Sequence, residues 1–306
     1  MPALNALKRV MTVGRVTEDG LTAGALLAMG VLPVLELFMR TFFKTGIPGS
    51  TGYVENLTLW VGFLGAMIAS RERRHLSLST GVAFLPPPLE QVAAILAAAI
   101  SAAVASGLFW ASLQFIRAEM ESPVKIAGWL PIWAVESVLP AAFAVIALRF
   151  VTQAAGWGSR ALTFAGIAAA ATIGFLLAPY APQLVWPGIA ALILAAILGA
   201  PIFVVLGGAA LLLFFGDGVP IAGIPVETYR IVVSPSIPAI PLFTLTGYIL
   251  AEGRTSQRLV RLFRALFGWM PGGLAIVTTL VCAFFTTFTG ASGVTILALG
   301  DRKSVV

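Results

Sequence analysis

Charged side chains are scarce in this sequence, because Asp, Glu, Lys and Arg make up 10% of its 306 residues while hydrophobic residues make up 59%. Together with a mean hydropathy of +0.98, this composition excludes an ordinary soluble globular protein. The formal net charge is +6, but the basic residues form short clusters between apolar runs, which argues against nucleic-acid binding. The composition predicts an all-α, polytopic membrane protein.

Cysteine and histidine each occur once, as Cys282 and His75. A lone cysteine excludes an intramolecular disulfide and argues against a thiolate metal site. His75 follows Arg73 and Arg74 with no second His or Cys nearby, so we expect it to make a headgroup or helix-end contact and not to bind a metal. The apolar runs contain no His cluster and no Ser or Cys beside a base. We therefore expect no enzymatic activity and no cofactor.

Eight apolar runs approach or exceed the length at which a helix crosses a bilayer, about 20 residues. They cover residues 21–43, 53–70, 89–116, 128–151, 161–178, 184–198, 201–215 and 237–250. The sequence therefore predicts about eight transmembrane helices, followed by the start of a re-entrant helical hairpin.

Lys and Arg collect in alternate loops, which predicts a cytoplasmic N-terminus. The clusters on that side are Lys8, Arg9 and Arg15, then Arg71, Arg73 and Arg74, then Arg149 and Arg160, and finally Arg254, Arg258, Arg261 and Arg264. The last four recur at helical spacing and form one basic face. We expect an amphipathic helix there, with these arginines in contact with anionic lipid.

Small and polar residues interrupt the last apolar stretch, residues 274–300, at Thr289-Gly290-Ala291-Ser292-Gly293. We predict a re-entrant hairpin with its tip at this point. Backbone that leaves the helix at bilayer depth frees carbonyl groups, and Ser292 and nearby threonines add hydroxyls, which together suit a sodium ion. The alternative interpretation is that these small residues only allow close helix packing.

Several segments resemble one transport family. Residues 52–66 (GYVENLTLWVGFLGA) and 73–77 (RRHLS) resemble the small membrane subunit of tripartite ATP-independent periplasmic (TRAP) transporters. Residues 236–247 (SIPAIPLFTLTG), 269–274 (WMPGGL) and 289–295 (TGASGVT) resemble the large membrane subunit. The resemblance implies a fused permease, with a small-permease-like four-helix unit at 1–155, a linker helix at 156–182 and the N-terminal part of a large-permease unit at 183–300.

The resemblance also implies a function. It implies a sodium-driven importer of organic acids, C4-dicarboxylates or other carboxylates, in a bacterial inner membrane, to which a periplasmic binding protein delivers the substrate. Part of the large subunit would move relative to a scaffold that contains the small one. The implied sodium ligands are Gly290, Ala291, Ser292 and Gly293, and the implied substrate contacts are Thr289 and Thr295. The commonest family tip reads Gly-Ser-Ser, so Ala291 can offer only its carbonyl. The alternative is an unrelated carrier or channel that needs no binding protein.

Three carboxylates lie in or near the predicted spans. Glu36 has Arg40 one turn later, which predicts an ion pair near the helix end. Glu55 and Glu136 belong to the unit that the resemblance treats as scaffold, so we expect structural or interfacial roles for them.

The last six residues, Asp301-Arg-Lys-Ser-Val-Val306, place three charges in the apolar second arm of the hairpin. Each charge would cost ~2.5–3.5 kcal/mol at the centre of a bilayer. The same hexapeptide is the translation of the start of a common sequencing adapter. We therefore predict that residues 301–306 are an assembly artefact and that the natural protein continues into a second hairpin, so that this chain alone does not transport.

Overall fold

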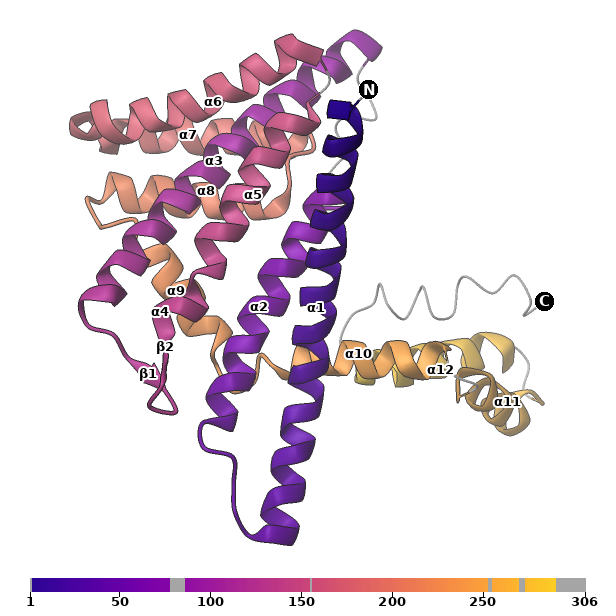
Figure 1. Ribbon diagram of the computed structural model, residues 1–306. Coiled ribbons are helices and arrows are strands. Elements are labelled where there is room, and N and C mark those ends of the chain that lie inside the picture. Colours follow the sequence, from indigo (N-terminus) through magenta and orange to yellow (C-terminus); the bar gives the residue numbers. More distant parts are fainter. Residues whose placement is uncertain (1, 78–85, 155, 253–254, 270–272, 290–306) are drawn as a thin grey trace.

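Helices dominate the computed structural model, which describes residues 2–77, 86–154, 156–252, 255–269 and 273–289 (Figure 1). The earlier helices are α1 (Pro2–Phe43), α2 (Ser50–Arg71), α3 (Pro87–Glu121), α4 (Ile132–Glu136), α5 (Val138–Gln153) and α6 (Gly156–Leu176). The later ones are the 3-10 turn η2 (Ala178–Tyr180), α7 (Ala181–Ile197), α8 (Ile202–Gly216), α9 (Gly223–Val232), α10 (Ala239–Glu252), α11 (Thr255–Phe267) and α12 (Gly273–Thr289). A small antiparallel hairpin, β1 (Lys125–Ile126) and β2 (Leu130–Pro131), precedes α4. The predicted all-α class is confirmed.

Each of the eight predicted spans corresponds to a helix or to consecutive helices. Five described segments are long and apolar enough to cross a membrane, namely Gly14–Phe43, Pro88–Glu121, Ile132–Gln153, Gly156–Leu176 and Ala178–Ile197. The apolar helices Ile202–Gly216 and Ala239–Ile249 are shorter. Helix α2 has 22 residues but carries Glu55 and Asn56 near its start, which lowers its apolar character.

Two features differ from the sequence-based expectation. Helix α1 begins at Pro2 and continues through the polar segment that precedes the first predicted span. Helix α9 was not predicted, because exposed charged residues such as Glu227 and Arg230 break its apolar pattern. Its Tyr229 and Val232 nevertheless pack against a buried cluster formed by α2 and α5, which holds the short helix against the bundle.

Helix α3 is the central element, since it contacts α5, α6, α7, α8 and α9. One face of this 35-residue helix carries small or medium side chains that are buried, among them Ala97, Ser101, Ala105, Leu108 and Ser112. Such residues let neighbouring helices approach closely in a membrane. At Gly166 of α6 a Cβ atom would lie 2.6 Å from the carbonyl oxygen of Ala99, so α6, the predicted linker helix, packs directly on α3.

The later helices complete the same bundle. Val104 and Leu108 of α3 form a buried cluster with Leu192 of α7 and Val204 of α8. Figure 1 shows α6, α7 and α8 crossing the direction of α1 and α2 at a large angle. The core is therefore shared between the first predicted unit and the helices that follow it.

Helices α10, α11 and α12 lie to one side of the bundle, and α10 contacts α1 (Figure 1). Helix α11 confirms the helix predicted from arginine spacing, and its Arg258, Arg261 and Arg264 are exposed. Arg254 lies outside the described residues. The contact of this helix with anionic lipid stays a prediction.

Candidate functional site

The predicted transport site lies at the end of α12. Thr289 is the last residue of this helix. Gly290, Ala291, Ser292, Gly293 and Thr295 lie outside the described residues, and so does the artefact predicted at 301–306. Helix α12 packs on α10 and α11, with Val277 and Val281 buried. The sodium and substrate assignments to these residues therefore stay predictions.

The ion pair predicted for Glu36 is confirmed. Arg40 Nε lies 2.6 Å from Glu36 Oε1, on the next turn of α1. The second carboxylate oxygen accepts a 2.6 Å hydrogen bond from the backbone N–H of Ile47. Glu36 therefore stabilises the turn between α1 and α2.

Glu136 lies at the junction of several helices near the start of α5. It is fully buried, and within the described part of the chain neither carboxylate oxygen has a hydrogen-bond partner. Trp60 Nε1 of α2 donates a 3.0 Å hydrogen bond to the carbonyl oxygen of Val135 beside it. Tyr229 of α9 donates from its hydroxyl to Asn56 Oδ1 of α2, at 3.2 Å. This junction joins α2 and α4 of the first predicted unit to α9 of the later one.

A second junction surrounds His75, beyond the other end of α2. The imidazole ring packs against two phenyl rings that also contact each other, with centroid separations of 6.2 Å to Phe150 of α5 and 5.1 Å to Phe203 of α8. The backbone N–H of Ile202 donates to the carbonyl oxygen of Leu76 at 2.9 Å. The segment after α2 is thereby attached to the start of α8.

The surroundings of His75 differ from the expected headgroup or helix-end contact. Its Nε2 atom is buried and has no hydrogen-bond partner among the residues that the structure describes. Burial lowers the pKa of His75 below its ordinary value of 6.5, because desolvation disfavours the imidazolium form. The ring therefore serves as an aromatic packing element between the two units.

An ion-pair cluster ties α1, α2 and α5 together at the same end of α2. Arg71 of α2 reaches Glu18 at 3.3 Å and Asp19 at 2.7 Å, both on α1. Arg149 of α5 pairs with the other carboxylate oxygen of Glu18 and also donates to the carbonyl oxygen of Met67. Sequence reasoning treated these arginines only as orientation signals and missed Glu18 and Asp19, since their partners are remote along the chain.

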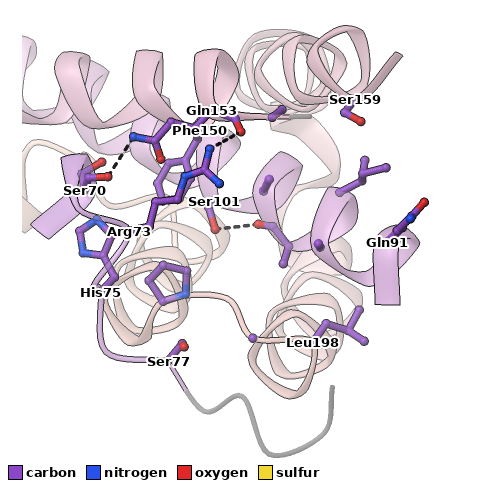
Figure 2. Close-up of a pocket in the computed structure, with 17 residues that line it drawn as sticks. Ser70, Arg73, His75, Ser77, Gln91, Ser101, Phe150, Gln153, Ser159 and Leu198 are labelled. Carbon is purple, nitrogen blue, oxygen red and sulfur yellow. Dashed lines mark hydrogen bonds between the residues drawn. The ribbon is translucent and has the colours of Figure 1, made fainter. Parts of the chain in front are cut away.

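A cavity of about 670 Å³ opens beside His75 (Figure 2). It is bounded by α3, α5, the segment after α2 and the turn between α7 and α8. Figure 2 shows hydrogen bonds that join Arg73, Gln153 and Ser70 in its wall. Arg73 Nη2 donates to the carbonyl oxygen of Gln153 at 2.9 Å, and Gln153 Nε2 donates to the carbonyl oxygen of Ser70 at 3.0 Å. The sequence carried no signal for this cavity.

The described side chains show no group of three or more His, Cys, Asp or Glu residues that could hold a metal ion. The apolar helices, the shared core and the polar junctions define a multi-pass helical membrane protein in which an early and a late set of helices form one bundle.

Comparisons with known proteins identify the family. Residues 29–160 match the DctQ component of tripartite ATP-independent periplasmic transporters, and residues 189–302 match the DctM component. The isethionate TRAP transporter permease protein DctMQ of Oleidesulfovibrio alaskensis is 29% identical over 79% of this chain and 39% of its own length. The chain therefore belongs to the TRAP transporter permeases, with small and large subunit sequences fused in one polypeptide.

Two large permease proteins are also similar. The C4-dicarboxylate TRAP transporter large permease protein DctM of Rhodobacter capsulatus is 33% identical over 34% of this chain and 24% of its own length. The ectoine TRAP transporter large permease protein TeaC of Halomonas elongata is 33% identical over 22% of this chain and 16% of its own length. The chain thus spans well under half the length of each of these relatives.

Proposed function

We propose that this chain is the membrane permease component of a sodium-driven TRAP importer of organic acids. The order of the two family matches along one chain carries the proposal, and the shared core of α3, α7 and α8 supports it, because it gives the two matched parts a common scaffold. The relatives named above are permeases and not enzymes, which supports a non-enzymatic role.

A small organic acid with a sulfonate or carboxylate group is the substrate class that the names of the relatives support. Their names refer to isethionate, C4-dicarboxylates and ectoine, each of which carries a sulfonate or carboxylate group. Thr289 and Thr295 would supply hydroxyl donors to such a group, beside a sodium ion held by the carbonyl groups of residues 290–293 and the hydroxyl of Ser292. The coupling ion is sodium, and no further cofactor enters the mechanism.

The proposed setting is a bacterial inner membrane with the N-terminus in the cytoplasm. A periplasmic binding protein delivers the substrate from the opposite side. The arginines of α11 then face the cytoplasmic leaflet, where anionic lipid attracts them.

The first test extends the gene sequence. Sequencing the source DNA across the codon for Gly300 is expected to show an open frame of roughly 300 further codons, with a second Gly/Ser-interrupted hairpin, as inverted-repeat transporters require. A neighbouring gene for a binding protein is expected as well. A genomic stop directly after Val306 would contradict the predicted artefact.

The second test measures transport by the complete permease in proteoliposomes with its binding protein. Uptake of a labelled organic acid is expected only with an inward sodium gradient. Ser292→Ala is expected to weaken apparent sodium affinity about tenfold, which corresponds to about 1.4 kcal/mol. Thr279→Val is the matched control, because this hydroxyl of α12 bonds the carbonyl of Ala275 within its own helix. Uptake without the binding protein would favour the unrelated carrier or channel instead.

A further inference from the structure

One side of the cavity beside His75 is polar and carries a positive charge. Arg73 provides the positive charge, and the polar residues on the same side of the wall include Ser70 and Gln153. Among the described residues that line the cavity, none is acidic. A wall that combines a guanidinium with amide and hydroxyl groups, and has no carboxylate, is complementary to an anion.

Some N–H groups of Arg73 have no acceptor among the described residues. Of the five N–H groups of a guanidinium, one bonds the carbonyl oxygen of Gln153 at 2.9 Å. No acidic side chain lies within 4.0 Å of Arg73 in the described part of the chain, whereas Arg71, two residues earlier, pairs with three carboxylates. Planar guanidinium groups with free donors bind phosphate oxygens well.

The α3 side of the cavity carries Gln91 and Ser101 but is otherwise apolar. Ala94, Ile95 and Ala98 of α3 line it, and Leu198 closes it from the end of α7. These α3 residues lie near the start of the segment Pro88–Glu121, which is apolar enough to span a membrane. The cavity therefore combines a cationic side and a hydrocarbon-like side at the end of a membrane span, where lipid headgroups lie.

We propose that this cavity binds one anionic phospholipid, with its phosphate group at Arg73 and the upper part of an acyl chain along Ala94 and Ala98. The wall includes Arg73 and Gln153 from the DctQ-like range and Leu198 from the DctM-like range, so the bound lipid bridges the two parts. Lipid binding in this cavity does not require transport activity.

Native mass spectrometry of the full 306-residue chain, released from detergent with phosphatidylglycerol or phosphatidylcholine added, tests the proposal. One tightly held phosphatidylglycerol is expected, bound in preference to phosphatidylcholine, whose choline cation finds no carboxylate in the wall. Arg73→Gln is expected to weaken binding about tenfold. Arg74→Gln removes the same charge one residue later, from a side chain that is exposed like that of Arg73 but does not line the cavity, and is expected to leave binding unchanged.

Ala94→Phe is a second, independent variant, since it fills the apolar side and keeps Arg73. It is expected to lower phosphatidylglycerol binding while the circular dichroism spectrum and unfolding midpoint stay as in the wild type. Equal losses in Arg73→Gln and Arg74→Gln would show general surface attraction and overturn the proposal. Displacement of the lipid by millimolar inorganic phosphate would also overturn it, because the site would then be one for free phosphate.

Discussion

Glu18 is expected to be the most important single side chain for attaching α1 to the bundle. It accepts from Arg71 at 3.3 Å and from Arg149, and the three side chains are only 14%, 14% and 18% exposed. A hydrogen bond to a charged group contributes about 1.5–3 kcal/mol when it is shielded from water. Glu18→Ala loses two of them, but Arg71 keeps Asp19 as a partner at 2.7 Å. We therefore expect a net loss of about 2–3 kcal/mol.

Unfolding by sodium dodecyl sulfate in mixed micelles, followed by tryptophan fluorescence, measures this loss. Glu72→Ala is the matched control, because Glu72 also pairs with Arg71, at 3.1 Å, but is 49% exposed. Exposed pairs contribute at most about 1 kcal/mol. A double-mutant cycle of Glu18→Ala with Arg149→Ala should give a coupling free energy of about 1–3 kcal/mol. If Glu18→Ala and Glu72→Ala destabilise the chain equally, the reasoning from burial is wrong.

Three other variants test the packing of the bundle. Burial lowers the pKa of His75 below 6.5, so the unfolded chain binds a proton at this residue more readily than the folded chain does. The free energy of unfolding should therefore decrease as the pH falls below about 6.5. His75→Phe should remove that part of the pH dependence of the unfolding midpoint. Glu136→Gln should leave the free energy of unfolding unchanged or raise it by up to about 2 kcal/mol, because no described residue donates a hydrogen bond to the buried carboxylate. A decrease of more than ~1 kcal/mol in the same unfolding assay would show that the carboxylate has a partner. Gly166→Ala should destabilise the chain by about 1–3 kcal/mol, because the new Cβ would lie 2.6 Å from the carbonyl oxygen of Ala99. Gly174→Ala in the same helix is the control, because its Cβ would meet nothing within 4 Å. A comparison of the unfolding midpoints should show the control to be neutral or slightly stabilising.

Local patterns of the sequence predicted the helices well. The eight apolar runs all became helices, and the arginine spacing of residues 254–264 predicted α11. The pairing of Glu36 with Arg40 followed from a separation of one helical turn. Helix α9 could not be found in this way, because its partly buried Tyr229 and Val232 pack on α2 and α5 while its exposed Glu227 and Arg230 are charged.

The two candidate sites differ in whether the sequence revealed them. The interrupted segment at Thr289-Gly290-Ala291-Ser292-Gly293 was visible in the sequence, because small polar residues in an apolar run are a local signal. The cavity beside His75 gave no such signal. It combines Arg73, Gln153 and Leu198 from three separate segments, none of which is unusual alone.

The sequence by itself determined the class of this protein and the position of its helices along the chain. Hydropathy and helical spacing are local patterns that can be recognised over a few turns. In a bilayer, an apolar run satisfies its backbone N–H and C=O groups by forming a helix. Only the tertiary structure decided which helices meet. Tyr229 bonds Asn56 across a separation of 173 residues, and Arg149 reaches Glu18 across 131. Such contacts depend on how small residues on α3 let its neighbours pack, and this packing is a property of the whole bundle and not of any single segment.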